Sequence, residues 1–91
     1  MKAEEVSKLL PQLKLKWDVV DNHSIKHEFV FTDFKESMAF INKVADIAES
    51  EGHHPDIHCF YNKVLIELWT HAVNGLSEND FILAAKIEEI E

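Results

Sequence analysis

Histidine is the residue type in this sequence best suited to chemistry near neutral pH, and four of the six histidines lie between positions 53 and 71. His53 and His54 precede Pro55, His58 follows shortly after, and His71 ends the run VLIELWTH. Imidazole titrates close to neutral pH, so one histidine can donate a proton while another accepts one. The sequence therefore predicts general acid–base chemistry carried by histidines.

These histidines come together only if the segments around them pair. The run DIHCFY after Pro55 and the run VLIELWTH are joined at Asn62-Lys63 and alternate in polarity, which predicts an antiparallel hairpin. In such a hairpin the first residues of one strand and the last of the other lie at the same end. Pro55 also biases His54 toward an extended backbone. We therefore expect His53, His54 and His71 to line one pocket.

A metal site is the main alternative on these residues alone. Three imidazoles with Glu49, Glu51 or Asp56 nearby have the donor types that zinc prefers. Adjacent His53-His54 point in different directions on an extended backbone, however, and the chain has no His-x-x-x-His on a helix. We therefore rank a metal site second. The earlier histidines, His23 and His27, are interpreted as solvated or structural.

Alternating and helical hydrophobic patterns predict seven elements around this site. In chain order they are a helix over 3–10, strands over 15–21 and 24–31, a helix over 34–52, strands over 56–61 and 64–71, and a last helix after position 77. The order α-β-β-α-β-β-α predicts an α+β fold with a four-stranded, mainly antiparallel sheet and three helices packed on one face.

Local signals place the ends of the helices. Thr32 or Asp33 can cap the long helix, Gly52 can end it, and the segment Ser77 to Asp80 resembles a capping box. The apolar residues expected on the buried face of the long helix are Phe34, Met38, Ile41, Val44, Ala45 and Ala48. Cys59, the single cysteine, excludes an internal disulfide and is expected to be buried because it lies in an apolar run.

The composition limits the classes of protein and partner. A length of 91 residues with 46% hydrophobic residues predicts one domain over 1–91, whose thin core favours a homo-oligomer. Nine lysines, no arginine and a formal charge of −8 argue against direct nucleic-acid binding. No apolar run approaches the roughly 20 residues that span a bilayer, so no membrane association and a cytoplasmic location are expected.

Read together, the residues singled out above form one spaced pattern. It runs Glu49-x-x-x-His53-His54-Pro55, then five residues to Tyr61, nine more to His71 and eight more to Asp80. It is accompanied by Trp17, Phe29-x-Phe31-x-x-Phe34, Tyr61-Asn62-Lys63-Val64 and Gly75-Leu76-Ser77-x-x-Asp80. Over nearly the whole chain, this pattern resembles the pterin-4a-carbinolamine dehydratase (4a-hydroxytetrahydrobiopterin dehydratase) family.

The resemblance implies a hydro-lyase that converts 4a-hydroxytetrahydrobiopterin to quinonoid dihydrobiopterin plus water during tetrahydrobiopterin recycling. It implies the same α-β-β-α-β-β-α fold, no metal and no organic cofactor. It also implies a homodimer joined through sheet edges or a homotetramer joined through helices. A small pterin is the expected partner.

Site residues are carried over position by position. His53 and His71 match the acid–base pair, with the acid left open, and His54 matches a histidine that positions the pterin and assists. Substrate-binding residues implied by the motif are Glu49, Pro55, Asp56, Ile57, Tyr61 and Asp80. Asp80 fits a helix cap as well as it fits a substrate contact.

One departure and two alternative functions follow from the same resemblance. Many relatives carry arginine near position 26, where this chain has Lys26. Lysine cannot make the bidentate hydrogen bonds that arginine makes. Animal relatives resemble dimerisation partners of a homeodomain transcription factor, and other members are associated with molybdopterin metabolism. Retention of the histidine motif favours the dehydratase.

Overall fold

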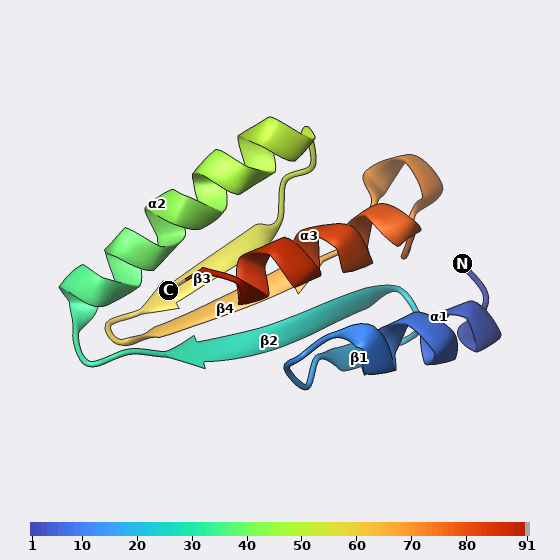
Figure 1. Ribbon diagram of the computed structural model, residues 1–91, viewed down its shortest axis with the longest axis horizontal. Coiled ribbons are helices and arrows are strands. Elements are labelled where there is room, and N and C mark those ends of the chain that lie inside the picture. The colour runs from blue at the N-terminus through green and yellow to red at the C-terminus, as the bar shows by residue number, and fades with distance from the viewer. Residues whose placement is uncertain (91) are drawn as a thin grey trace.

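The computed structural model describes residues 1–90 (Figure 1). The helices are α1 (Ala3–Leu9), α2 (Phe34–Glu51) and α3 (Glu78–Glu88), with short 3-10 helices η1 (Leu10–Gln12) and η2 (His71–Val73). The strands are β1 (Asp18–Val20), β2 (Ser24–Val30), β3 (Asp56–Phe60) and β4 (Lys63–Leu68). The predicted order of helices and strands is confirmed.

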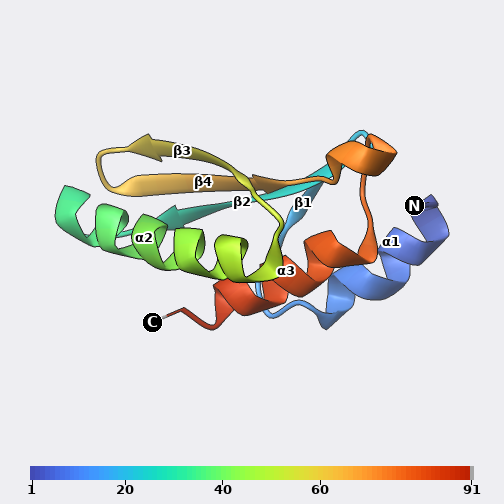
Figure 2. The ribbon, with the colours of Figure 1, turned by 90° about the horizontal axis from the view of Figure 1, so that it is seen from above.

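The four strands form one antiparallel sheet in the order β1-β2-β4-β3. Figure 2 shows the three α-helices below this sheet, with the other face uncovered. The predicted α+β fold with helices on one face is therefore confirmed. None of the helices within residues 1–90 is long and apolar enough to cross a membrane.

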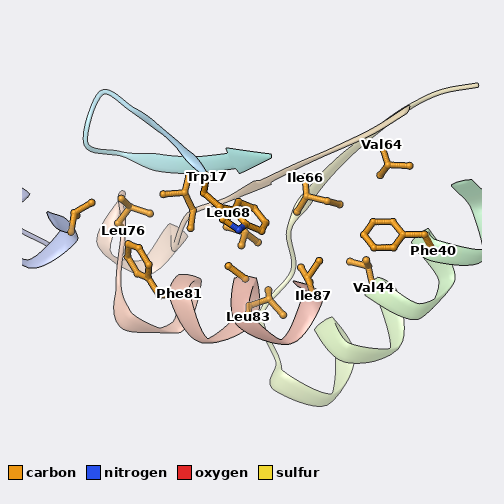
Figure 3. Close-up of a cluster of buried hydrophobic side chains, with 13 residues drawn as sticks. Trp17, Phe40, Val44, Val64, Ile66, Leu68, Leu76, Phe81, Leu83 and Ile87 are labelled. Atoms are coloured by element: carbon orange, nitrogen blue, oxygen red, sulfur yellow. The ribbon is translucent and has the colours of Figure 1, made fainter. Parts of the chain in front are cut away.

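The core lies between the covered face of the sheet and the helices. Ile25 of β2 lies directly opposite Leu68 of β4, so both side chains point to the same face of the sheet. Both are fully buried. Val44 of α2 and Ile87 of α3 close the core from below (Figure 3). Opposite these residues, the open face carries the alternate side chains of each strand.

Helix α2 begins and ends as predicted, but its buried face is rotated from the predicted one. The Asp33 carboxylate accepts a hydrogen bond from the Glu36 amide at 2.9 Å, and Gly52 ends the helix with φ of 63°. The buried residues are Ser37, Phe40, Val44 and Ala48. Phe34, Met38 and Ala45 are exposed, because the stripe that faces the sheet runs through Phe40 instead.

The first strand is shorter than the predicted span of 15–21. The amides of Lys14 and Leu15 donate to the Glu88 carboxylate of α3, at 2.9 and 2.7 Å, rather than to a neighbouring strand. The indole nitrogen of Trp17 donates to the same carboxylate at 2.8 Å, and Trp17 is only 2% exposed. Pairing with β2 therefore starts at Asp18.

The second hairpin turns one residue earlier than predicted. Phe60 pairs with Lys63, so the turn residues are Tyr61 and Asn62, and Tyr61 adopts a left-handed φ of 50°. The prediction that Cys59 is buried is wrong. Strand β3 is an edge strand with only β4 beside it, and this leaves Cys59 exposed near the turn.

Candidate active site

His53 lies immediately after α2, where it meets the first turn of α3. Its backbone amide donates to the Ala48 carbonyl at 3.1 Å, which ties the residue to the end of α2. Its Nε2 atom lies 2.5 Å from Oδ1 of Asp80. The His53 side chain is 15% exposed and the Asp80 side chain is fully buried. Asp80 therefore holds the His53 ring through Nε2, and only a small part of the side chain is exposed to solvent.

Asp80 uses both carboxylate oxygens within the fold. While Oδ1 faces His53, Oδ2 accepts hydrogen bonds from the Thr70 hydroxyl and from the Ser77 amide, each at 2.9 Å. The bond from Ser77 is the reciprocal half of the predicted capping box. The Thr70 and Ser77 hydroxyls also lie 2.6 Å apart. Asp80 thus joins the end of β4, the start of α3 and His53.

The contact with Asp80 decides which nitrogen of His53 is available. With Nε2–H directed at a carboxylate, the neutral ring carries its lone pair on Nδ1. Nδ1 of His53 has no hydrogen-bond partner among residues 1–90. This nitrogen can therefore accept a proton from a bound molecule.

His54 is held differently and lies at the surface. Its Nε2 atom lies 2.8 Å from Oε2 of Glu49, and the two side chains are 65% and 77% exposed. An exposed pair of this kind contributes little stability but limits the orientations of the imidazole. Glu49, which lies near the end of α2, is therefore the residue that contacts His54.

His71 begins the 3-10 helix after β4 and packs on an aromatic ring. Its imidazole stacks on the Trp69 indole, with ring centroids 3.8 Å apart and planes 30° apart. The indole nitrogen in turn donates to Oδ2 of Asp56 at 3.0 Å. Asp56 of β3 lies directly opposite Glu67 on β4, so Trp69 is its diagonal neighbour on the open face.

Two consecutive residues directly after β4 therefore support two different histidines. Thr70 contacts Asp80, which anchors His53, whereas Trp69 contacts His71. Because Thr70 is extended, these neighbouring side chains point to opposite sides of the chain. The residues that support His53 and His71 therefore lie on opposite sides of the chain that follows β4.

The remaining predicted substrate residues are divided between this end of the sheet and other places. Pro55 and Asp56 lie beside the histidines, at the start of β3. Ile57 is half-buried opposite Ile66, and its side chain packs against the core. Tyr61 lies in the turn at the other end of the β3–β4 hairpin, so it does not join this cluster.

Sequence reasoning left two partners out of the site, Trp69 and His23. The His23 ring lies 4.6 Å from the Trp69 ring, and its Nε2 lies 3.4 Å from Oδ1 of Asn74. The two residues approach because β2 pairs with β4, which the sequence did not specify. His27 is structural as expected, with Nδ1 2.8 Å from the Lys16 carbonyl oxygen.

The described residues show neither a metal cluster at this site nor a histidine in the lining of the three cavities described next. Within residues 1–90, no group of three or more His, Cys, Asp or Glu side chains is arranged to hold a metal ion. Three surface cavities of about 300 to 360 Å³ lie elsewhere, and none of the three is lined by a histidine. The site described here consists of histidines and the acidic or aromatic side chains that contact them.

Comparison with known proteins assigns the chain to a family. The family model described as pterin 4 alpha carbinolamine dehydratase matches residues 1–90. The chain belongs to this family.

Curated relatives of the dehydratase family match almost the full chain. A putative pterin-4-alpha-carbinolamine dehydratase from Legionella pneumophila (strain Corby) is 50% identical, and the match covers 99% of this chain and 80% of the relative. The mitochondrial pterin-4-alpha-carbinolamine dehydratase 2 of Arabidopsis thaliana is 49% identical over 98% of this chain. Here the chain spans 50% of the plant protein.

Solved structures show the same fold. The crystal structure of a transcriptional coactivator/pterin dehydratase from Brucella melitensis matches with a TM-score of 0.89 and 34% identity, over 97% of this chain and 94% of that one. A pterin dehydratase-like protein identified as a RuBisCO assembly factor matches with a TM-score of 0.69 and 22% identity, over 82% and 88%. The second likeness concerns the fold alone.

Proposed function

We propose that this chain dehydrates a 4a-hydroxytetrahydropterin, such as 4a-hydroxytetrahydrobiopterin, to the quinonoid dihydropterin, with histidines as general acid and base. Membership of the dehydratase family and the names of relatives such as the Legionella protein support the reaction. The observation that carries the assignment of residues is the contact between His53 and the buried carboxylate of Asp80.

The reaction needs two proton transfers and no change of oxidation state. The bond between C4a and the hydroxyl oxygen breaks, and a proton delivered to that oxygen lets it leave as water. The adjacent ring nitrogen loses its proton, and its electron pair forms the new double bond to C4a. General acid and base groups typically contribute about 10²–10⁴-fold to such steps.

His53 is the base in this proposal. Its Nδ1 atom takes the proton from the ring nitrogen, while Nε2–H stays directed at Asp80. The negative charge of the buried carboxylate then offsets the positive charge that forms on the imidazole. Thr70 and the Ser77 amide hold the carboxylate in place during this change.

His71 is the acid in this proposal and delivers a proton to the leaving hydroxyl. The pterin lies across the end of β4, so that it reaches imidazoles on both sides of the strand. His54, oriented by Glu49, borders the pterin and assists in positioning it. In this proposal the backbone groups of Pro55, Asp56 and Ile57 recognise the amide edge of the pterin, which is supported by the position of β3 at the edge of the sheet.

The test compares turnover of chemically generated 4a-hydroxytetrahydropterin by the wild-type protein and by His53→Ala and His71→Ala. We expect the wild type to accelerate dehydration and each variant to lose about 100-fold or more in kcat. His58→Ala is the matched control, because His58 is an exposed histidine on the neighbouring strand β3. Full turnover in both site variants, or no acceleration by the wild type, contradicts the proposal.

The physiological setting is a further part of the proposal. Dehydration of 4a-hydroxytetrahydrobiopterin serves recycling of the pterin if the same organism contains an aromatic amino acid hydroxylase. A homodimer or homotetramer stays a prediction that sedimentation can test. The cytoplasmic location also stays a prediction, since one relative is named as mitochondrial.

A further inference from the structure

The three site histidines are held in two different ways. An acidic side chain contacts His53 and another contacts His54, in each case through Nε2. By contrast, neither ring nitrogen of His71 has a hydrogen-bond partner in the part of the chain that the structure describes. His71 is also exposed. An exposed imidazole without a hydrogen bond exchanges rotamers on the picosecond to nanosecond scale unless packing restrains it.

The packing that restrains His71 is its stack on Trp69. Ring centroids 3.8 Å apart with planes 30° apart place the imidazole in contact with the indole ring. The indole is itself fixed, because its nitrogen donates to the Asp56 carboxylate at 3.0 Å. His23, in the turn directly before β2, adds a second imidazole 4.6 Å from the same indole. Trp69 thus joins the turn before β2, strand β3 and the residues that follow β4.

We propose that Trp69 is a positioning residue for His71, and that Asp56 holds Trp69 in the required orientation. The inference rests on the proposed function, in which His71 transfers a proton. A stack fixes the plane of the imidazole while leaving both ring nitrogens available, whereas a hydrogen bond occupies one of them. Proton transfer depends strongly on such orientation, and a misplacement of about 1 Å can cost about 100-fold.

This assignment gives Trp69 and Asp56 roles that differ from contact with substrate. The indole ring of Trp69 is in contact with imidazoles, so in this proposal it orients His71 and does not bind the pterin. The Asp56 carboxylate accepts the indole N–H, so its side chain acts on His71 through Trp69. The Asp56 backbone stays available to the substrate as proposed above.

The activity test uses substitutions that separate the stack from the hydrogen bond. Trp69→Ala removes both, and we expect kcat to fall about 10- to 100-fold with a KM change of less than about threefold. Trp69→Phe keeps an aromatic ring and is expected to restore most of kcat. Asp56→Ala is expected to lower kcat less than Trp69→Ala, and Asp56→Asn, which still offers an oxygen to the indole, to rescue it.

A double-mutant cycle then tests whether Asp56 acts through Trp69. In the Trp69→Phe background the hydrogen bond is already absent, so adding Asp56→Ala is expected to cause no further loss of kcat. A loss as large as in the wild-type background overturns the role given to Asp56. Thermal unfolding of every variant checks that changes in kcat do not follow global stability.

A readout independent of activity is the NMR spectrum of His71. The ring protons of His71 are expected to lie upfield in the wild type because of the indole ring current, and to move downfield in Trp69→Ala. Trp17→Phe is the matched control, because Trp17 is buried in the core and its ring lies against His27 in a tilted arrangement and against Phe29 edge-on. Unchanged His71 shifts in Trp69→Ala overturn the proposal.

The outcomes also separate this inference from the proposed function. If His71→Ala loses turnover while Trp69→Ala keeps wild-type kcat, the positioning role is wrong and the proposed function stands. If the wild type does not dehydrate the pterin at all, the proposed function fails, and the NMR comparison alone decides whether Trp69 orients His71.

Discussion

The imidazole of His53 lies 2.5 Å from the carboxylate of Asp80, and that carboxylate is completely buried. A buried carboxylate is costly unless hydrogen bonds and an opposite charge compensate it. Here the Thr70 hydroxyl and the Ser77 amide supply the hydrogen bonds. No buried side-chain nitrogen or oxygen in residues 1–90 lacks a partner. The arrangement couples the stability of the start of α3 to the chemistry of His53.

Asp80→Asn separates these two functions. Asparagine still offers an oxygen to Thr70 and the Ser77 amide, but it carries no charge to offset a protonated His53. We expect kcat to fall by up to about 100-fold, while thermal unfolding shows a folded protein. Steady-state kinetics with chemically generated substrate provide the measurement.

Asp80→Ala is the companion variant and removes the hydrogen bonds as well. Because Thr70 and the Ser77 amide then lose their acceptor, we expect a loss of roughly 2–4 kcal/mol in the free energy of unfolding. Denaturant unfolding measures this loss. Equal stability of the alanine and asparagine variants would show that Asp80 is not a structural anchor.

Glu49→Gln is predicted to have a small effect, in contrast to Asp80→Asn. The Glu49 carboxylate and the His54 imidazole are both largely exposed, and exposed ion pairs contribute about 0–1 kcal/mol. We expect the free energy of unfolding to change by less than about 0.5 kcal/mol and kcat to keep the same order of magnitude. A loss of kcat as large as that of Asp80→Asn would place Glu49 in the chemistry itself.

The fold could be predicted from the sequence because its elements follow local rules. Alternation from Val64 to Leu68 and the caps at Asp33 and Gly52 depend on neighbouring residues, and each is found in the structure. The exposed position of Cys59 could not be read from its apolar neighbours, since exposure depends on which strand lies at the sheet edge.

The site was predictable in part for the same reason. The motif identified His53, His54 and His71, and the pairing of β3 with β4 brings the first and last of these to one end of the hairpin. The contact of His23 with Trp69 depends on the pairing of β2 with β4. That pairing joins residues far apart in the sequence, and no local pattern specifies it.

Glu88→Ala is predicted to destabilise the protein without affecting turnover. The Glu88 carboxylate accepts from two backbone amides and from the indole nitrogen of buried Trp17. Leaving that indole N–H unpaired costs about 1–3 kcal/mol, which denaturant unfolding can detect. Glu88 lies two helical turns beyond Asp80 on α3, so we expect kcat to be unchanged.

Glu89→Ala is the matched control for Glu88→Ala. Glu89 pairs with Lys14 at the surface, and the hydrogen bond from Lys14 to Glu89 raises the pKa of Lys14 above its ordinary value. Because both side chains are largely exposed, solvent screens this interaction. If the Glu89 variant is as unstable as the Glu88 variant, the exposed pair of Lys14 and Glu89 stabilises the contact between α3 and the segment before β1. The hydrogen bonds from Glu88 to Trp17 and to the neighbouring amides would then not be the main cause.

Gly52→Ala is predicted to affect both stability and catalysis, because Gly52 ends α2 directly before His53. Its φ of 63° is left-handed, and a side chain there costs about 1–2 kcal/mol, although no atom lies within 4 Å of an added Cβ. Asparagine tolerates this conformation better, so Gly52→Asn is expected to be intermediate in stability. If the left-handed turn also sets the direction of His53 toward Asp80, kcat should follow the same order. Wild-type kcat in a destabilised Gly52→Ala protein would show that Asp80, and not the turn, is sufficient to place the imidazole.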